Sequence, residues 1–275
     1  MKKVCVIGWP IAHSRSPIIH NYWLKHYGLE GLYERREVKP EELPEFLTNL
    51  KAHGYVGCNV TIPHKIEALK YVDHTDEVVR HMGSLNTIWY AGDKRHATSS
   101  DGDGFYLNLE ASVPNLNLKN KRAIVLGAGG SAKAIIERLL RAGMAEIAVQ
   151  NRTPAKIAEL NSIFGKQIKM LHPDHFVSES KTASLLVNCT SQGMKGQPEL
   201  EIDLSALPTD AVVADLVYVP LETRLLRAAK ARGLPCAGGL GMLLHQGTIG
   251  FEKWFGVKPV VTQELYNLVA SDIPP

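Results

Sequence analysis

Lys65 is the residue of the first half whose type and position most suggest chemistry. It follows the run 58–64, in which the period of two of a strand places Asn59 and Thr61 opposite Val60 and Ile62. Near the end of a strand, that polar face is expected to meet a ligand. Lys65 itself is expected in the first turn of the next helix, where burial and the helix dipole favour a neutral amine. This environment suits a general acid/base, although an exposed lysine on a short helix fits the same pattern.

Asp101 is the candidate partner of Lys65. It lies in the run 99–105, where two glycines predict a turn between two domains. Ordinary turn chemistry explains such an aspartate, but a carboxylate beside an interdomain crevice could also bond a substrate hydroxyl. It would then keep Lys65 charged when the reaction requires it.

Further polar residues lie where a packed core would not need them. Ser14 and Ser16 follow the first predicted strand, and this end of a strand faces the usual ligand crevice of an open α/β sheet. Ser16 fits equally well as the N-cap of a helix that begins at Pro17. Asn86 places an amide at the start of another predicted strand.

A glycine-rich turn at residues 127–132, Gly-Ala-Gly-Gly-Ser-Ala, follows one predicted strand and opens a helix. The pattern fits G-x-G-x-x-G/A, in which glycines let backbone N–H groups approach a pyrophosphate at the helix N-terminus. Simple helix packing is the alternative, but the strand before the turn and the helix after it favour dinucleotide binding.

Arg152 follows the next strand, at the place where an NAD enzyme usually has an acidic residue for the ribose hydroxyl. A guanidinium there suits a 2′-phosphate through paired charge-assisted hydrogen bonds. The sequence therefore predicts NADP, with a solvated arginine and a helix-capping Thr153 as the alternative.

Short β-branched runs alternate with amphipathic stretches, which predicts an α/β fold of two domains. Strands are expected at 4–7, 33–37, 56–62 and 86–90, and helices at 17–27, 41–53, 64–71 and 76–82. A doubly wound domain follows, with strands at 122–126, 146–149, 185–188 and 211–214 and helices at 131–142 and 154–164. Residues 240–271 should form one or two helices that are too short to fold alone.

Composition limits the classes of function. The net charge of +3 comes from mixed signs, which gives little support to nucleic-acid binding. No apolar run is long enough to span a membrane, and the four separated cysteines resemble buried thiols of a reducing compartment, so a cytoplasmic protein is expected. His172 and His175 are closely spaced, but no cysteine lies nearby to complete a zinc set, and no metal is expected.

The chain resembles the shikimate dehydrogenase family in seven motifs that keep the family's order. They span Gly8 to Gln246 and lie at residues 10–17, 59–65, 86–87 with 101–102, 127–130 with 151–153, 188–194, 215–220 and 239–246. The resemblance implies an N-terminal α/β substrate domain of residues 1–101 and 240–275, onto which the C-terminal helices pack. It also implies a Rossmann-type NADP domain of residues 102–239.

The same resemblance implies an NADP-dependent oxidoreductase that reversibly reduces 3-dehydroshikimate to shikimate in aromatic amino acid and chorismate biosynthesis. Lys65 and Asp101 would be catalytic. The substrate would contact Ser14, Ser16, Thr61, Asn86, Tyr218 and Gln246. The cofactor would contact Glu77, Gly127, Ala128, Gly129, Gly130, Ser131, Asn151, Arg152, Thr153, Lys156, Leu216 and Gly239.

The sequence departs from the family pattern at two places. Ser99 and Ser100 replace a common Asn-Thr pair, and Trp9 stands where Asn often precedes Pro10. These changes leave quinate open as a substrate. A quinate/shikimate dehydrogenase and a non-catalytic NADP-binding sensor are the alternative functions, and a homodimer is an assembly that the sequence leaves open.

Overall fold

The structure is a computed structural model that describes residues 1–274. The chain forms two compact units, residues 1–101 with 244–269 and residues 102–243 with the segment from 270 onward. These are called unit 1 and unit 2 below. None of the helices within residues 1–274 combines the length and apolar character that crossing a bilayer requires.

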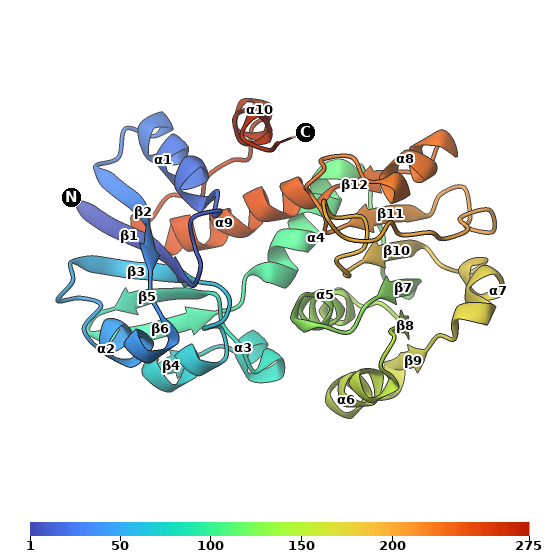
Figure 1. Cartoon of the computed structure of the whole chain (residues 1–275), viewed down its shortest axis with the longest axis horizontal. Coiled ribbons are helices and arrows are strands. Elements are labelled where there is room, and N and C mark those ends of the chain that lie inside the picture. The colour runs from blue at the N-terminus through green and yellow to red at the C-terminus, as the bar shows by residue number, and fades with distance from the viewer. Residues whose placement is uncertain (275) are drawn as a thin grey trace. The chain divides into compact units, whose positions relative to one another are not determined.

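Unit 1 contains a mixed sheet of six strands in the order β2-β1-β3-β5-β6-β4 (Figure 1). β1 pairs in parallel with β2 and β3, whereas β5 is antiparallel to β3 and β6. The strands are β1 (Lys2–Gly8), β2 (Gly31–Glu37), β3 (Tyr55–Val60), β4 (His74–Thr75), β5 (Thr87–Ala91) and β6 (Lys94–Thr98). The helices are α1 (Ser16–His26), α2 (Leu43–Thr48), α3 (Glu77–Met82) and the 3₁₀ helices η1 (Pro40–Glu42) and η2 (Glu67–Tyr71).

Strand β1 is buried on both faces of its sheet. Cys5 and Ile7 belong to one apolar cluster, which α2 and η2 help to form, and Val4 and Val6 belong to a second cluster, which contains Trp254. This alternation is the period of two of a strand with helices on both sides, and it explains the continuous apolar run.

Unit 2 contains a parallel sheet of six strands in the order β12-β11-β10-β7-β8-β9. From the centre of the sheet, β7 to β9 follow one another toward one edge and β10 to β12 toward the other. This is the doubly wound order of a Rossmann fold, with its switch point between β7 and β10. The strands are β7 (Arg122–Leu126), β8 (Glu146–Gln150), β9 (Ile168–Met170), β10 (Leu185–Asn188), β11 (Val212–Asp215) and β12 (Cys236–Ala237). The helices are α4 (Asp101–Ser112, whose first residue belongs to unit 1), α5 (Gly130–Arg141), α6 (Pro154–Phe164), α7 (Phe176–Ser180), α8 (Arg224–Ala231), η3 (Gly165–Gln167) and η4 (Pro173–His175).

Two further helices, α9 (Gly239–Phe255) and α10 (Gln263–Ser271), follow β12. Within unit 1, Trp254 Nε1 donates to the carbonyl of Ile88 at 2.8 Å, and Trp23 Nε1 donates to that of Val260 at 3.0 Å. Gly57 makes the first contact possible, because a Cβ there would lie 2.3 Å from Trp254 Nε1. The predicted α/β class and the packing of the C-terminal helical segment on the N-terminal sheet are confirmed.

Four sequence predictions of local structure need correction. Ser16 is the first residue of α1 and not its N-cap, which is Arg15 without a side-chain cap bond. Lys65 precedes η2 and does not lie in the first turn of an α-helix. Asp101 begins α4 instead of lying in a turn. The helix expected at 41–53 is η1 followed by the short α2.

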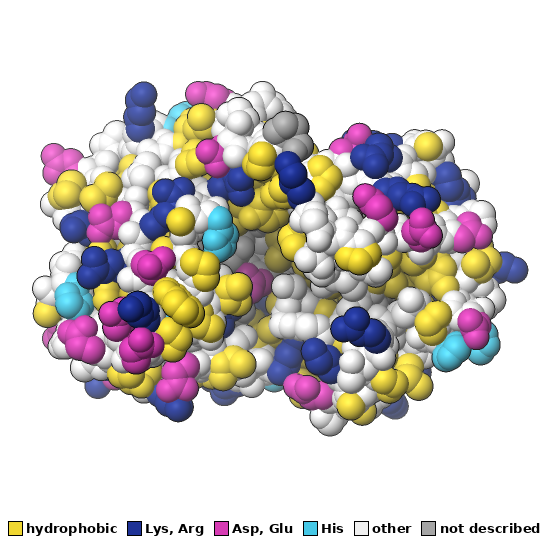
Figure 2. All heavy atoms as spheres, viewed as in Figure 1, with side chains coloured by type: hydrophobic (Ala, Val, Ile, Leu, Met, Phe, Trp, Pro, Cys, Tyr) yellow, Lys and Arg dark blue, Asp and Glu magenta, His cyan; other side chains and the backbone are white. Residues whose placement is uncertain are grey.

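The four cysteines differ in burial. Cys5 and Cys58 are buried, as expected, whereas Cys189 and Cys236 are only partly buried, and all four are free thiols. Within residues 1–274, no three His, Cys, Asp or Glu side chains are grouped so that they could hold a metal ion. Figure 2 shows basic and acidic side chains interspersed on the visible face of the molecule.

Candidate active site

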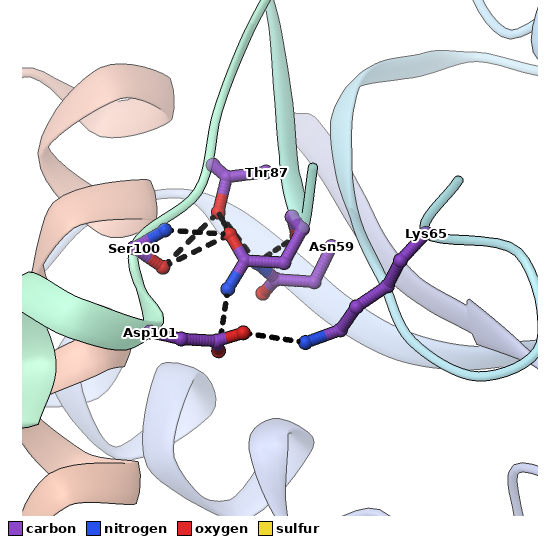
Figure 3. Close-up of polar contacts among 6 residues, drawn as sticks. Asn59, Lys65, Thr87, Ser100 and Asp101 are labelled. Atoms are coloured by element: carbon purple, nitrogen blue, oxygen red, sulfur yellow. Dashed lines mark hydrogen bonds and ion pairs between the residues drawn. The ribbon is translucent and has the colours of Figure 1, made fainter. Parts of the chain in front are cut away.

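Lys65 and Asp101 form a direct ion pair in unit 1. Lys65 Nζ donates to Asp101 Oδ2 at 2.7 Å, and their side chains are 28% and 14% exposed. A partly buried pair of this length is a charge-assisted hydrogen bond that water screens less than a surface pair. The two residues therefore lie together as the sequence predicted (Figure 3).

Lys65 reaches this place through long-range contacts of its own loop. The main-chain carbonyl of Lys65 accepts from the amide of Leu85 at 2.9 Å. The neighbouring His64 is buried, and its Nε2 lies 2.7 Å from the carbonyl of Val38. Because tertiary contacts hold both residues, Lys65 lies in a turn before η2 and not in the first turn of an α-helix.

The buried amide of Asn86 holds the other oxygen of Asp101. Its Nδ2 donates to Asp101 Oδ1 at 2.8 Å, and its Oδ1 accepts from the main-chain N–H of Ser100 at 2.9 Å. The Ser100 hydroxyl adds a further donor at 3.1 Å. The serine that replaces the family's usual threonine is therefore used as a hydrogen-bond donor in this network.

The remaining predicted substrate residues are distributed over several segments. The hydroxyls of Ser14 and Ser16 lie 3.3 Å apart, and both residues are partly buried. Thr61 follows β3, and Gln246 lies on α9, both partly buried in unit 1. Tyr218 lies in unit 2, in the segment after β11.

Two residues near the site were missed or misread from the sequence. Tyr33 donates through its hydroxyl to Asn59 Oδ1 at 2.6 Å, and burial raises the Tyr33 pKa, so the phenol stays protonated. Asn59 was expected to face a ligand, but its amide is bonded to other protein groups. Strand periodicity gives the face of a residue and not its bonding partner, so no sequence signal distinguishes these roles.

In unit 2, the glycine turn lies at the end of β7, beside the segment that follows β10. Gly127 has a φ of +101°, and a Cβ there would lie 3.1 Å from Thr190 Cγ2 and 3.2 Å from the carbonyl oxygen of Cys189. In contrast, nothing lies within 4 Å of a Cβ built at Gly129 or Gly130. The first glycine is therefore required for the turn, and the next two leave open space at the start of α5.

Most other predicted cofactor residues of unit 2 lie near the ends of its strands. Ala128 and Ser131 flank the glycine turn, and Asn151, Arg152, Thr153 and Lys156 follow β8, with Arg152, Thr153 and Lys156 exposed. Thr153 is at the N-cap position of α6 but makes no side-chain cap bond. Glu77 is exposed in the first turn of α3 in unit 1.

The segment that carries Leu216 and Tyr218 is held by a buried carboxylate, Asp215. It accepts from Asn188 Nδ2 at 2.9 Å, from the amide of Val217 at 3.0 Å and from the hydroxyl of Thr223 at 2.6 Å. Burial raises the pKa of Asp215, while these donors oppose that rise. Gly239 packs against the same segment, since a Cβ there would lie 2.2 Å from the carbonyl oxygen of Leu216.

A doubly wound parallel sheet with an open glycine turn at its switch point is the arrangement of the dinucleotide-binding domain of dehydrogenases. Three family models match the chain: "Shikimate dehydrogenase substrate binding domain" over residues 6–88, "Shikimate / quinate 5-dehydrogenase" over 109–195 and "Shikimate 5'-dehydrogenase C-terminal domain" over 239–261. The NADP(+) shikimate dehydrogenase of Rhodopseudomonas palustris strain TIE-1 is 53% identical over 274 residues, which is 100% of this chain and 98% of the relative. The chain belongs to the shikimate dehydrogenase family, as its motifs predicted.

Solved structures agree with this assignment. The shikimate 5-dehydrogenase of Thermus thermophilus, in complex with NADP(H) and shikimate, is 34% identical with a TM-score of 0.86 over 100% of both chains. The quinate dehydrogenase of Corynebacterium glutamicum, in complex with NAD, is 27% identical with a TM-score of 0.88 over 98% of this chain and 99% of that one. The fold alone therefore does not distinguish shikimate from quinate, or NADP from NAD.

Proposed function

We propose that the chain reversibly reduces 3-dehydroshikimate to shikimate with NADPH, a step of aromatic amino acid and chorismate biosynthesis. The observation that carries this proposal is the bonded Lys65–Asp101 pair in a family member that covers 98% of its R. palustris relative. A sensor that only bound NADP would have no need of a partly buried lysine paired in this way. The NADP(+) specificity named for the R. palustris relative supports the cofactor.

The residues of unit 2 fit a dinucleotide with a 2′-phosphate. The open backbone at Gly129 and Gly130 leaves room for a pyrophosphate at the start of α5. Arg152 and Lys156 are exposed, and they provide two cations for the 2′-phosphate. The proposed contacts are Gly127, Ala128, Gly129, Gly130, Ser131, Asn151, Arg152, Thr153, Lys156, Leu216 and Gly239, with Glu77 retained on the resemblance alone.

The proposed chemistry uses the ion pair for proton transfer. Bound NADPH supplies the hydride that reduces the C3 ketone of the substrate. Lys65 Nζ gives a proton to the ketone oxygen and takes it back in the reverse direction. Asp101 Oδ2 accepts from Lys65 and so orients the ammonium, while Asn86 holds Asp101 Oδ1.

We propose that Ser14, Ser16, Thr61, Asn86, Tyr218 and Gln246 bind the hydroxyls and carboxylate of the substrate. These side chains offer hydroxyl and amide groups, which suit a polyhydroxylated acid. The substrate domain would comprise residues 1–101 and 240–275, and the NADP domain residues 102–239. A cytoplasmic location and a homodimer complete the proposal.

Relaxed specificity for quinate is the second candidate. It is favoured by the departures from the family pattern at Trp9 and Ser99, since Trp9 is 46% exposed and Ser99 is buried beside the site. One assay separates the candidates: reduction of NADP and of NAD with shikimate, then with quinate. Turnover of shikimate but not quinate, with NADP but not NAD, supports the first function. Equal turnover of the two acids supports the second. No turnover of either acid would indicate a sensor.

A further inference from the structure

The amide of Asn59 connects Tyr33 to the segment that carries Asn86. Asn59 Nδ2 donates to the main-chain carbonyl of Asn86 at 3.0 Å and to the hydroxyl of Thr87 at 3.1 Å. Its Oδ1 accepts from the Tyr33 hydroxyl at 2.6 Å. A main-chain carbonyl can only accept, so these partners assign the two ends of the Asn59 amide without ambiguity.

The direction of the next hydrogen bond follows from this assignment. Thr87 is fully buried, and its hydroxyl carries a single hydrogen. Because this oxygen accepts from Asn59, the hydrogen is free to point at Asn86 Oδ1, 2.9 Å away. Asn86 Oδ1 therefore receives donors from Thr87 and Ser100, which turns its Nδ2 toward Asp101 Oδ1.

We propose that Asn59 is a positioning residue, which acts through Asn86 to hold Asp101 toward Lys65. Asn59 fixes residue 86 at two points, directly at its main chain and through Thr87 at its side chain. In this series Asn59 donates to Thr87, Thr87 donates to Asn86, and Asn86 donates to Asp101 Oδ1. Asp101 Oδ2 is then left to accept from Lys65. The inference rests on the proposed function, because it assigns Asn59 a role in the proton transfer at Lys65.

The test compares Asn59→Ala with Asn21→Ala as a matched control. Asn21 also uses both ends of its amide inside unit 1, donating to the carbonyl of Tyr33 at 2.8 Å and accepting from its N–H at 3.0 Å. In the described part of the chain, Asn21 bonds only the main chain of Tyr33 and has no bond to Asn59, Asn86 or Thr87. Its loss should therefore lower stability without releasing Asn86 or the Asp101 carboxylate. Both variants are measured by thermal melting and by single-turnover oxidation of NADPH with 3-dehydroshikimate.

Single turnover with saturating enzyme in excess over substrate separates positioning from folding, because an unfolded fraction of the enzyme leaves the rate constant of the reaction step unchanged. For Asn59→Ala, we expect a rate constant about tenfold below wild type, the factor that one lost hydrogen bond in an ordered site produces. For Asn21→Ala, the rate constant should stay at the wild-type value even if the melting temperature falls equally. Equal rate constants in the two variants would overturn the proposal.

Asn59→Asp is a second variant of nearly the same shape. Its carboxylate can still accept from Tyr33, but it cannot donate to Asn86 and it attracts the Thr87 hydrogen away from Asn86. Its rate constant should be at or below that of Asn59→Ala, and a wild-type rate constant would contradict the positioning role. A wild-type protein without NADPH oxidation would instead reject the proposed function, so the two failures are distinguishable.

Discussion

Burial fixes the protonation state of single residues around the site. His20 is 1% exposed and stacks on Tyr33 with ring centroids 4.1 Å apart. Burial lowers the pKa of His20 from 6.5 to about 3, so the ring is neutral in the folded protein. Its Nδ1 has no hydrogen-bond partner within residues 1–274, which leaves nothing at that atom to stabilise a charge. His20 thus packs as a neutral aromatic ring on Tyr33, the residue whose hydroxyl donates to Asn59.

A buried neutral histidine makes stability depend on pH. Below pH 6.5 the unfolded chain binds a proton at His20, whereas the folded chain does so only near pH 3. Stability is therefore complete above the unfolded pKa and falls as the pH decreases toward the folded pKa. Between about pH 7.5 and about pH 5, wild type should lose about 2 kcal/mol more unfolding free energy than His20→Phe, which keeps a ring but cannot titrate. Urea unfolding at both pH values measures this difference, and equal losses in the two proteins would show that His20 is not the titrating group.

At the scale of elements, local periodicity predicted most helices and strands but not the positions of Lys65 and Asp101, the two residues proposed to be catalytic. Helix α6 was predicted with its observed bounds, and the strand of residues 122–126 is exact. Lys65 was placed wrongly because its carbonyl bonds Leu85, twenty residues later in the chain. The glycines after Asp101 suggested a turn, but Gly102 serves helix packing, since a Cβ there would lie 2.5 Å from the carbonyl of Ala134 on α5. Contacts between distant segments decide both cases, and a local pattern does not contain them.

The segment after β8 should determine the choice of cofactor. Replacing Arg152 with Asp removes a cation for the 2′-phosphate and adds a carboxylate that suits a ribose hydroxyl. We expect the ratio of kcat/KM for NADPH to that for NADH to fall about a hundredfold, the effect of losing a charge-assisted pair. Lys166→Asp, an equal charge change at an exposed residue of η3, serves as the control. An unchanged ratio in Arg152→Asp would remove Arg152 from the cofactor site.

The turn before α9 offers a second test, with adjacent glycines as a matched pair. A Cβ at Gly239 would collide with the carbonyl of Leu216, whereas at Gly238 the nearest atom would be Leu226 Cδ1 at 3.7 Å. Gly239→Ala should therefore displace the 216–218 segment, lower the melting temperature and raise KM for NADPH. Gly238→Ala should leave both quantities near wild type. Equal behaviour of the two variants would mean that the segment adapts without consequence for the cofactor.

For the whole molecule, family membership extends over both units, whereas the proposed proton transfer lies within unit 1. The sequence allowed the family to be inferred because most of the family's motifs are short polar runs that follow predicted strands, and such runs can be recognised locally. The donor series from Tyr33 to Asp101 joins β2, β3, β5 and the start of α4, and no single motif contains it. The choice between shikimate and quinate is not determined by the fold that both kinds of dehydrogenase share. We expect it to depend on side chains such as Trp9.

Lys65→Ala provides the decisive measurement, made with NADPH and 3-dehydroshikimate and accompanied by calorimetric titration with shikimate. If Lys65 Nζ moves the proton, kcat should fall by about a thousandfold, while the Kd of shikimate changes by less than about threefold. A near-normal kcat with a large rise in KM and Kd would instead make Lys65 a binding residue and would contradict its assignment as the acid/base.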